Sequence, residues 1–187
     1  MKTFQQVHEK GWIYRDVKPD NFLVGKPGSR LANTVHVVDL GMAKLYRDPK
    51  TLQHVPHRNG RSLAGTLRYM SLKAHQGQEQ SRRDDLEALG NVFIYFLRGQ
   101  LPWQNIKAAT KEEKSAKIRE KKQATAITEL CEGYPMVKEY FTYVRELGFE
   151  ATPDYDYLRE LFSSARSDMG GADDGAYDWE DAHGPRR

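Results

Sequence analysis

A short polar loop followed by a strand, a turn and a second strand is the feature that most constrains this chain. The loop covers residues 14–21 and reads Tyr-Arg-Asp-Val-Lys-Pro-Asp-Asn. The apolar run 22–24 and the β-branched run 35–38 predict two strands, and the Gly and Pro residues between them predict a turn. Because strands joined by a turn run antiparallel, the ribbon should bring Asn21 and Asp39, which flank it, to the same end.

The residues at that end are the types that phosphoryl transfer requires. That reaction needs a carboxylate near the attacking hydroxyl, ligands for Mg²⁺ and a cation for the developing phosphate charge. Asp16 can orient the hydroxyl or accept its proton, and Lys18 can place an ammonium group beside the γ-phosphate. Asn21 and Asp39 offer oxygen ligands to a hard cation, and Gly41 lets the backbone turn. Each residue alone is typical of a solvated loop, but their joint order and spacing match the kinase signature.

The rest of the chain predicts helices. Residues 1–10 are expected to form a helix that Gly11 ends, and residues 39–72 form a long segment without periodicity. Segments of this length in compact domains are usually functional or disordered. Helical spacing of apolar residues then predicts four further helices, within residues 81–98, 110–122, 136–147 and 152–162.

Capping signals indicate where these helices begin. Ser81 and Thr110 each open a capping box, and Thr152 predicts an N-cap with Pro153 at the first helical position. The helix after Ser81 is apolar on most sides, so we expect it to be buried along its length, Phe96 included. The helix after Thr110 is highly charged and is expected to be exposed.

Composition excludes several classes of protein. Hydrophobic residues make up 39% of the chain and charged residues 29%, which is a globular balance. The net charge of +3 is small, and glutamates interrupt the basic residues of the segment 111–122, so no nucleic-acid partner is expected. No apolar run is long enough to cross a bilayer, which predicts no membrane insertion. The single Cys131 excludes an internal disulfide, and we expect an intracellular protein of the cytoplasm, the nucleus or both.

Two motifs carry a resemblance to protein kinases. Residues 16–21 resemble the kinase catalytic loop, and Asp39-Leu40-Gly41 resembles the metal-binding Asp-Phe-Gly motif. Longer segments, within a similarity that runs from about Val7 to Trp179, are similar to the casein kinase 1 family. They are Lys-Pro-Asp-Asn-Phe-Leu at 18–23, Ala-Lys-Leu-Tyr-Arg-Asp at 43–48, Glu-Gln-Ser-Arg-Arg-Asp-Asp at 79–85, Leu-Pro-Trp-Gln at 101–104 and Lys-Ala-Ala-Thr-Lys at 107–111.

The resemblance implies a fold that is mainly α with a small β-ribbon, the C-terminal lobe of a protein kinase. It implies ATP and Mg²⁺ as cofactors and phosphorylation of Ser or Thr in acidic or already phosphorylated proteins. The oligomeric state is not readable. The implied organisation is a lobe over residues 1–180, with the catalytic loop at 14–21, the activation segment at 39–73, the helical subdomain at 81–166 and a Gly- and Asp-rich tail at 167–187.

The resemblance also assigns roles to residues outside the two motifs. Asp85 would be the buried helix carboxylate that holds the backbone of the catalytic loop, although a first-turn carboxylate is also favoured by the helix dipole. Gly65-Thr66 would lie in the substrate-binding part of the activation segment. The site for substrate anions would use Arg68 and Lys114 with the backbone near Asn105, and Arg61 is a further basic candidate; alone, Lys114 reads as an exposed helix lysine.

Three departures from the family pattern matter. Tyr14 stands where the family has His, and Leu40 replaces Phe. The sequence also contains no Gly-rich loop, strand lysine or helix glutamate of the kinase N-terminal lobe, so we expect a truncated form that binds ATP poorly and has little or no activity alone.

Two other functions remain open from the sequence. A catalytically silent kinase-like fragment could bind acidic or phosphorylated partners through Arg61, Arg68 and Lys114. A small-molecule phosphotransferase of the aminoglycoside or choline kinase kind would share an Asp and Asn loop. Such enzymes usually lack a lysine two residues after the Asp, so Lys18 argues against that class.

Overall fold

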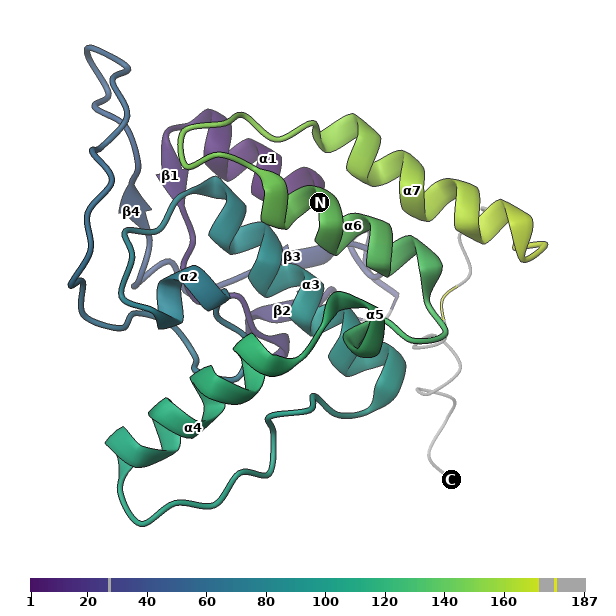
Figure 1. Ribbon diagram of the computed structural model, residues 1–187. Coiled ribbons are helices and arrows are strands. Elements are labelled where there is room, and N and C mark those ends of the chain that lie inside the picture. The colour runs from purple at the N-terminus through teal and green to yellow at the C-terminus, as the bar shows by residue number, and fades with distance from the viewer. Residues whose placement is uncertain (27, 172–176, 178–187) are drawn as a thin grey trace.

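Figure 1 shows the computed structural model, which describes residues 1–26, 28–171 and 177. The described chain is mainly helical with a few short strands, as the sequence predicts. Its helices are α1 (Lys2–Glu9), α2 (Leu72–His75), α3 (Arg82–Arg98), α4 (Lys111–Ala124), α5 (Ile127–Leu130), α6 (Pro135–Glu146) and α7 (Tyr155–Asp168).

The predicted ribbon is confirmed. Strand β2 (Phe22–Val24) pairs antiparallel with β3 (Val35–Val37), with Phe22 opposite Val37. Directly beyond the paired strands, the Val38 amide donates a hydrogen bond to the Asn21 carbonyl at 3.0 Å. The ribbon thus brings the end of the polar loop beside the residue that precedes Asp39.

A second, smaller ribbon was not predicted. Strand β1 (Trp12–Ile13) lies directly before the polar loop, and it pairs antiparallel with β4 (Lys44–Leu45). Two-residue strands leave no alternation in the sequence, so only the partner reveals them. This pairing ties the start of the polar loop to the segment that follows Asp39-Leu40-Gly41.

Helix α3 runs through the middle of the fold and carries much of the core (Figure 1). Its predicted N-terminus is confirmed, because the Ser81 amide donates to the Asp84 carboxylate at 2.8 Å, and Gly99 ends the helix with φ of 73°. It packs closely on α6, since a Cβ at Gly90 would stand 2.8 Å from the Phe141 ring. The expectation of burial is wrong at the last turn, where Phe96 is 63% exposed.

Two predictions about the other helices are also wrong. Helix α7 begins at Tyr155, and its N-cap is Asp154, whose carboxylate accepts from the Tyr157 amide at 2.9 Å, so Thr152 and Pro153 lie before it. A carboxylate is a stronger N-cap acceptor than a threonine hydroxyl. Helix α4 is largely exposed, as expected, but its last turn buries Lys122 to 2% exposure.

The end of α7 crosses the predicted boundary between helical subdomain and tail. The helix continues to Asp168, two residues beyond the expected limit at 166. Residues 172–176 and 178–187 of the predicted tail lie outside the described residues. Within the part of the chain that is described, no helix is long and apolar enough to span a membrane.

Candidate active site

Asp16 is the point where the polar loop meets the segment 39–73. Its side chain is buried, and its Oδ2 accepts a hydrogen bond from the Lys18 ammonium at 2.6 Å. Its Oδ1 accepts from the Thr66 hydroxyl at 2.7 Å, fifty residues further along the chain. The Asn21 amide nitrogen donates to the Asp16 carbonyl at 3.0 Å. The structure thus gathers three other predicted site residues, Lys18, Asn21 and Thr66, around Asp16.

These contacts keep Asp16 ionised. Burial alone would raise the pKa of this carboxyl, but hydrogen bonds from Lys18 and Thr66 and the charge of Lys18 outweigh burial, and the pKa lies below its usual value. The pair acts reciprocally, because the hydrogen bond to Asp16 raises the pKa of Lys18. At neutral pH the loop therefore presents a carboxylate and an ammonium group side by side.

The metal-binding candidates, Asn21 and Asp39, differ in their surroundings. Asn21 is buried and turns its amide nitrogen to Asp16, so Asp16 does not engage its oxygen. Asp39 is exposed, and one of its oxygens accepts from the Gly41 amide at 3.0 Å. Within the described ranges no three or more His, Cys, Asp or Glu side chains gather as a metal cage. One carboxylate and one amide oxygen fit Mg²⁺, which keeps waters and phosphate oxygens as its other ligands.

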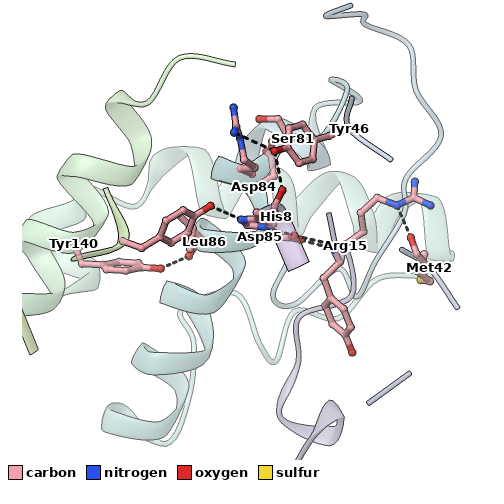
Figure 2. A network of polar contacts seen from close by, with 12 residues as sticks. His8, Arg15, Met42, Tyr46, Ser81, Asp84, Asp85, Leu86 and Tyr140 are labelled. Carbon is pink, nitrogen blue, oxygen red and sulfur yellow. Dashed lines mark hydrogen bonds and ion pairs between the residues drawn. The ribbon is translucent and has the colours of Figure 1, made fainter. Parts of the chain in front are cut away.

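Asp85, on the first turn of α3, holds the backbone of the polar loop (Figure 2). Its Oδ2 accepts from the Tyr14 amide at 2.6 Å, and its Oδ1 accepts from the Arg15 amide at 2.7 Å. The side chain is 1% exposed, so these bonds are shielded from water. A helix carboxylate thus fixes the two residues that precede Asp16.

His8 completes this cluster, and sequence reasoning missed it. Its Nε2 donates to Asp85 at 2.9 Å, and its Nδ1 lies 2.6 Å from the Tyr155 hydroxyl of α7. Figure 2 shows His8 directly beside Asp85. The available signal was the spacing of Phe4 and His8, four residues apart on the same face of α1, where both side chains are buried.

Tyr14, the departure from the family's His, also has a structural role. Its ring is buried, and its hydroxyl donates a short hydrogen bond to the Val38 carbonyl, one residue before Asp39. Burial raises the pKa of Tyr14 to about 12, so the hydroxyl keeps its proton and remains a donor at neutral pH. The Tyr14 hydroxyl therefore links the polar loop to the residue directly before the metal-binding candidate Asp39.

Backbone conformation at the site is unusual in two non-glycine residues. Arg15 has φ of 69° and Asp39 has φ of 61°, both in the left-handed region that costs energy for residues with a side chain. Arg15 is held by Asp85 at its amide and donates from Nε to the Met42 carbonyl at 2.6 Å. Gly65 approaches it closely, since a Cβ there would stand 2.4 Å from the Arg15 carbonyl oxygen.

The segment after Thr66 is fixed by buried donors from three places. Lys122 donates from Nζ to the Leu67 carbonyl at 2.8 Å and to the Met70 carbonyl at 2.6 Å. The carbonyls between these two are also engaged. The Trp103 indole donates to Arg68 at 2.7 Å, and the Asn91 amide donates to Tyr69 at 2.8 Å.

The three candidate anion-binding residues have different environments. The Nε of Arg61 lies 3.0 Å from Glu79, which also binds Lys44 at 2.6 Å, so this arginine is already paired. Arg68 and Lys114 form no ion pair with a described carboxylate; the guanidinium of Arg68 lies 5.8 Å from the centre of the adjacent tyrosine ring, and Lys114 is exposed on α4. Arg61 therefore differs from Arg68 and Lys114, because it alone of the three forms an ion pair with a described carboxylate.

Comparisons with known proteins agree with this geometry. The protein kinase domain family matches residues 1–150. Casein kinase I homolog 2 of Schizosaccharomyces pombe is 59% identical over 180 residues, which cover 96% of this chain and 41% of that protein. Casein kinase I homolog RAG8 of Kluyveromyces lactis is 55% identical over 97% of this chain and 34% of its own length. The chain thus spans between about a third and two fifths of the relatives it matches.

Replacing Asp85 with Asn should release the polar loop. The amide cannot accept from Tyr14, Arg15 and His8 as an ionised carboxylate does, and a buried donor is left unpaired. We expect the free energy of unfolding to fall by about 3 kcal/mol, with faster hydrogen exchange at the two loop amides. The control is Asp156→Asn, on the exposed face of α7, which should change neither the free energy of unfolding nor hydrogen exchange at these amides. Unchanged exchange at both amides in D85N would contradict the assigned role.

Lys122 should make stability depend on pH in a defined direction. Burial lowers its pKa from 10.5 to about 7, so between these values the unfolded chain holds a proton that the folded chain has released. Stability should therefore rise with pH across this window, by up to about 1.4 kcal/mol per pH unit. The measurement is the difference in free energy of unfolding between wild type and Lys122→Met from pH 7 to 10. If the stability of wild type relative to Lys122→Met stays constant or falls as the pH rises, Lys122 is not a neutral, buried amine.

Proposed function

Since this chain belongs to the protein kinase family and, within it, to casein kinase 1, we propose that it forms the substrate and metal half of a Ser/Thr kinase active site. One observation carries the proposal: Asp16 is buried, ionised and in contact with Lys18, Asn21 and Thr66 at once. In this proposal the fold corresponds to the C-terminal lobe of a kinase, with the activation segment at residues 39–73.

The contacts of Asp16 support separate roles for Asp16, Lys18 and Thr66 in the proposed reaction. The substrate hydroxyl would donate a hydrogen bond to the Asp16 carboxylate, which would orient the hydroxyl for attack. The carboxylate would take the proton as the new P–O bond forms, while the bond between the γ-phosphorus of ATP and its bridging oxygen breaks and ADP leaves. The ammonium group of Lys18 would lie beside the transferred phosphate and offset its charge. Thr66 holds the other carboxylate oxygen and so fixes the plane of the carboxylate.

Asn21 and Asp39 would hold Mg²⁺ through the amide oxygen and the carboxylate. The bound cation supplies positive charge that offsets the phosphate oxygens of ATP. The protein's own contribution is to fix the two ligands, since the Val38 amide bonds Asn21 and the Tyr14 hydroxyl bonds Val38. The sequence contains neither a Gly-rich loop nor a strand lysine, so we propose that strong ATP binding requires those elements to be joined to this chain.

Kinase activity should depend on Asp16 and on the joined elements together. We expect the 187-residue chain alone to phosphorylate casein weakly or not at all. Fused behind a casein kinase 1 N-terminal lobe, it should phosphorylate casein, and Asp16→Asn should lower kcat by about 10² to 10⁴ fold. The measurement is transfer of labelled phosphate from ATP.

The matched control lies four residues away. Asp20→Asn makes the same chemical change at an exposed carboxylate in the same loop and should leave kcat within about twofold. Robust activity of the chain alone would refute the requirement for the joined elements. A fused protein that stays inactive, although it folds and binds ATP, would instead favour the catalytically silent binding module.

We further propose that acidic or phosphorylated proteins are the substrates. Arg68 and Lys114 support this proposal, because neither is paired with a described carboxylate. The carbonyl of Arg68 is anchored by Trp103, so its backbone is fixed while its guanidinium stays available. Arg61 contributes less in this proposal, since Glu79 already neutralises it.

Removing these two cations should affect acidic substrates selectively. In the fused protein, Arg68→Gln with Lys114→Gln should raise the KM for a phosphorylated peptide by about tenfold or more and leave the KM for its unphosphorylated form nearly unchanged. Arg119→Gln, an exposed cation on the same helix as Lys114, is the control. Equal effects on both peptides would show that the two cations do not select anionic substrates.

A further inference from the structure

A polar pocket lies between the stretch that follows β4, the start of α3 and the loop before α7. Its volume is about 590 Å³, and Tyr46, Arg47, His54, Arg82 and Glu150 are among its lining residues. Asp16, Lys18, Asn21 and Asp39 do not line it. The pocket is thus separate from the residues assigned to phosphoryl transfer.

Two arginines of this pocket are not neutralised by any described carboxylate. Arg82 is 8% exposed; it donates to the Tyr46 hydroxyl at 3.1 Å and to the Glu150 carbonyl at 2.6 Å, and its Nε has no described partner. Arg47 donates to the Glu9 carbonyl. By contrast, Arg61 and Arg145 form ion pairs with buried glutamates.

A tyrosine ring holds these cations in place. The guanidinium of Arg82 lies 4.6 Å from the centre of the Tyr46 ring, and that of Arg47 lies 5.5 Å from it. The His54 ring is 5.2 Å from the same ring, and its buried Nε2 has no described partner. Tyr46 is itself fixed, because its hydroxyl donates to the His8 carbonyl at 2.8 Å.

An unpaired cation in a shielded position is costly, and an anion bound beside it would recover that cost. Two guanidinium groups match the charge of a phosphate monoester, which is about −1.5 to −2 at pH 7. Guanidinium also binds phosphate oxygens through paired N–H groups. We propose that this pocket binds a phosphate monoester, held by Arg47 and Arg82.

The same chemistry could come from a phosphorylated side chain or from free inorganic phosphate. Glu150, at the loop before α7, is the acidic residue that lines the pocket, and its carboxylate opposes binding of an anion. The proposal therefore predicts opposite changes in affinity for the anion. Removing the charge of Glu150 should strengthen binding, whereas removing the charge of Arg47 should weaken it. Simple loss of folding cannot strengthen binding.

The test uses the full chain without Mg²⁺, in an Arg68→Gln and Lys114→Gln background, so that the proposed substrate site does not contribute. The probes are a phosphoserine peptide, its unphosphorylated form and inorganic phosphate, each titrated at constant ionic strength and pH 7 while the thermal unfolding midpoint is followed. We expect the midpoint to rise with phosphoserine peptide or inorganic phosphate and not with the unphosphorylated peptide. A response to inorganic phosphate alone identifies the free anion as the ligand.

The variants decide whether the pocket is responsible. Arg47→Met should weaken the apparent affinity about tenfold or more, Glu150→Gln should strengthen it, and Arg119→Met on α4 should leave it unchanged. Arg82→Lys, which keeps the charge but loses the planar group, should also weaken it. The proposal is overturned if wild type shows no dose-dependent rise, or if Arg47→Met behaves like Arg119→Met. Because activity is not measured, failure here leaves the proposed kinase function unaffected.

Discussion

Asp85 is a carboxylate with almost no access to water, and a charge in that position is stable only if hydrogen-bond donors surround it. The donors come from the polar loop and from α1, through Tyr14, Arg15 and His8. Helix α3 is capped by Ser81 and Asp84 and packed against α6. The polar loop is therefore bonded to a helix that is itself held in place. The position of Asp16 thus depends on a carboxylate that never contacts the reacting groups.

The backbone of residues 67–70 is also held by hydrogen bonds to buried side chains, but here the backbone accepts. Buried side chains of α3, α4 and the loop between them supply the donors, including Lys122 and Trp103. Thr66 then bonds directly to Asp16. Asp16 is thus fixed by Lys18 within the polar loop and by Thr66 from the segment fifty residues further along the chain.

Local patterns in the sequence were enough to predict the ribbon, the start of α3 and the meeting of Asn21 with the residues around Asp39. The position of Asp85 came from the family resemblance. The burial of Lys122 could not be predicted, because it is polar in a helix that looks solvent-facing, and only a distant partner makes its burial favourable. His8 was missed, although it lies on the same face of α1 as Phe4, because its partner Asp85 is 77 residues away in the sequence. The start of α7 was misplaced because Thr152 followed by Pro153 also matches a helix start, whereas the stronger acceptor, the Asp154 carboxylate, caps the helix.

The hydrogen bond between His8 and Tyr155 joins residues 147 positions apart. A ribosome adds about 5 to 20 residues per second, so roughly 7 to 30 seconds separate the synthesis of these two partners. During that interval α1 has been made but one of its polar contacts does not yet exist. This polar contact of α1 therefore forms only after α7, the last described helix, has been synthesised.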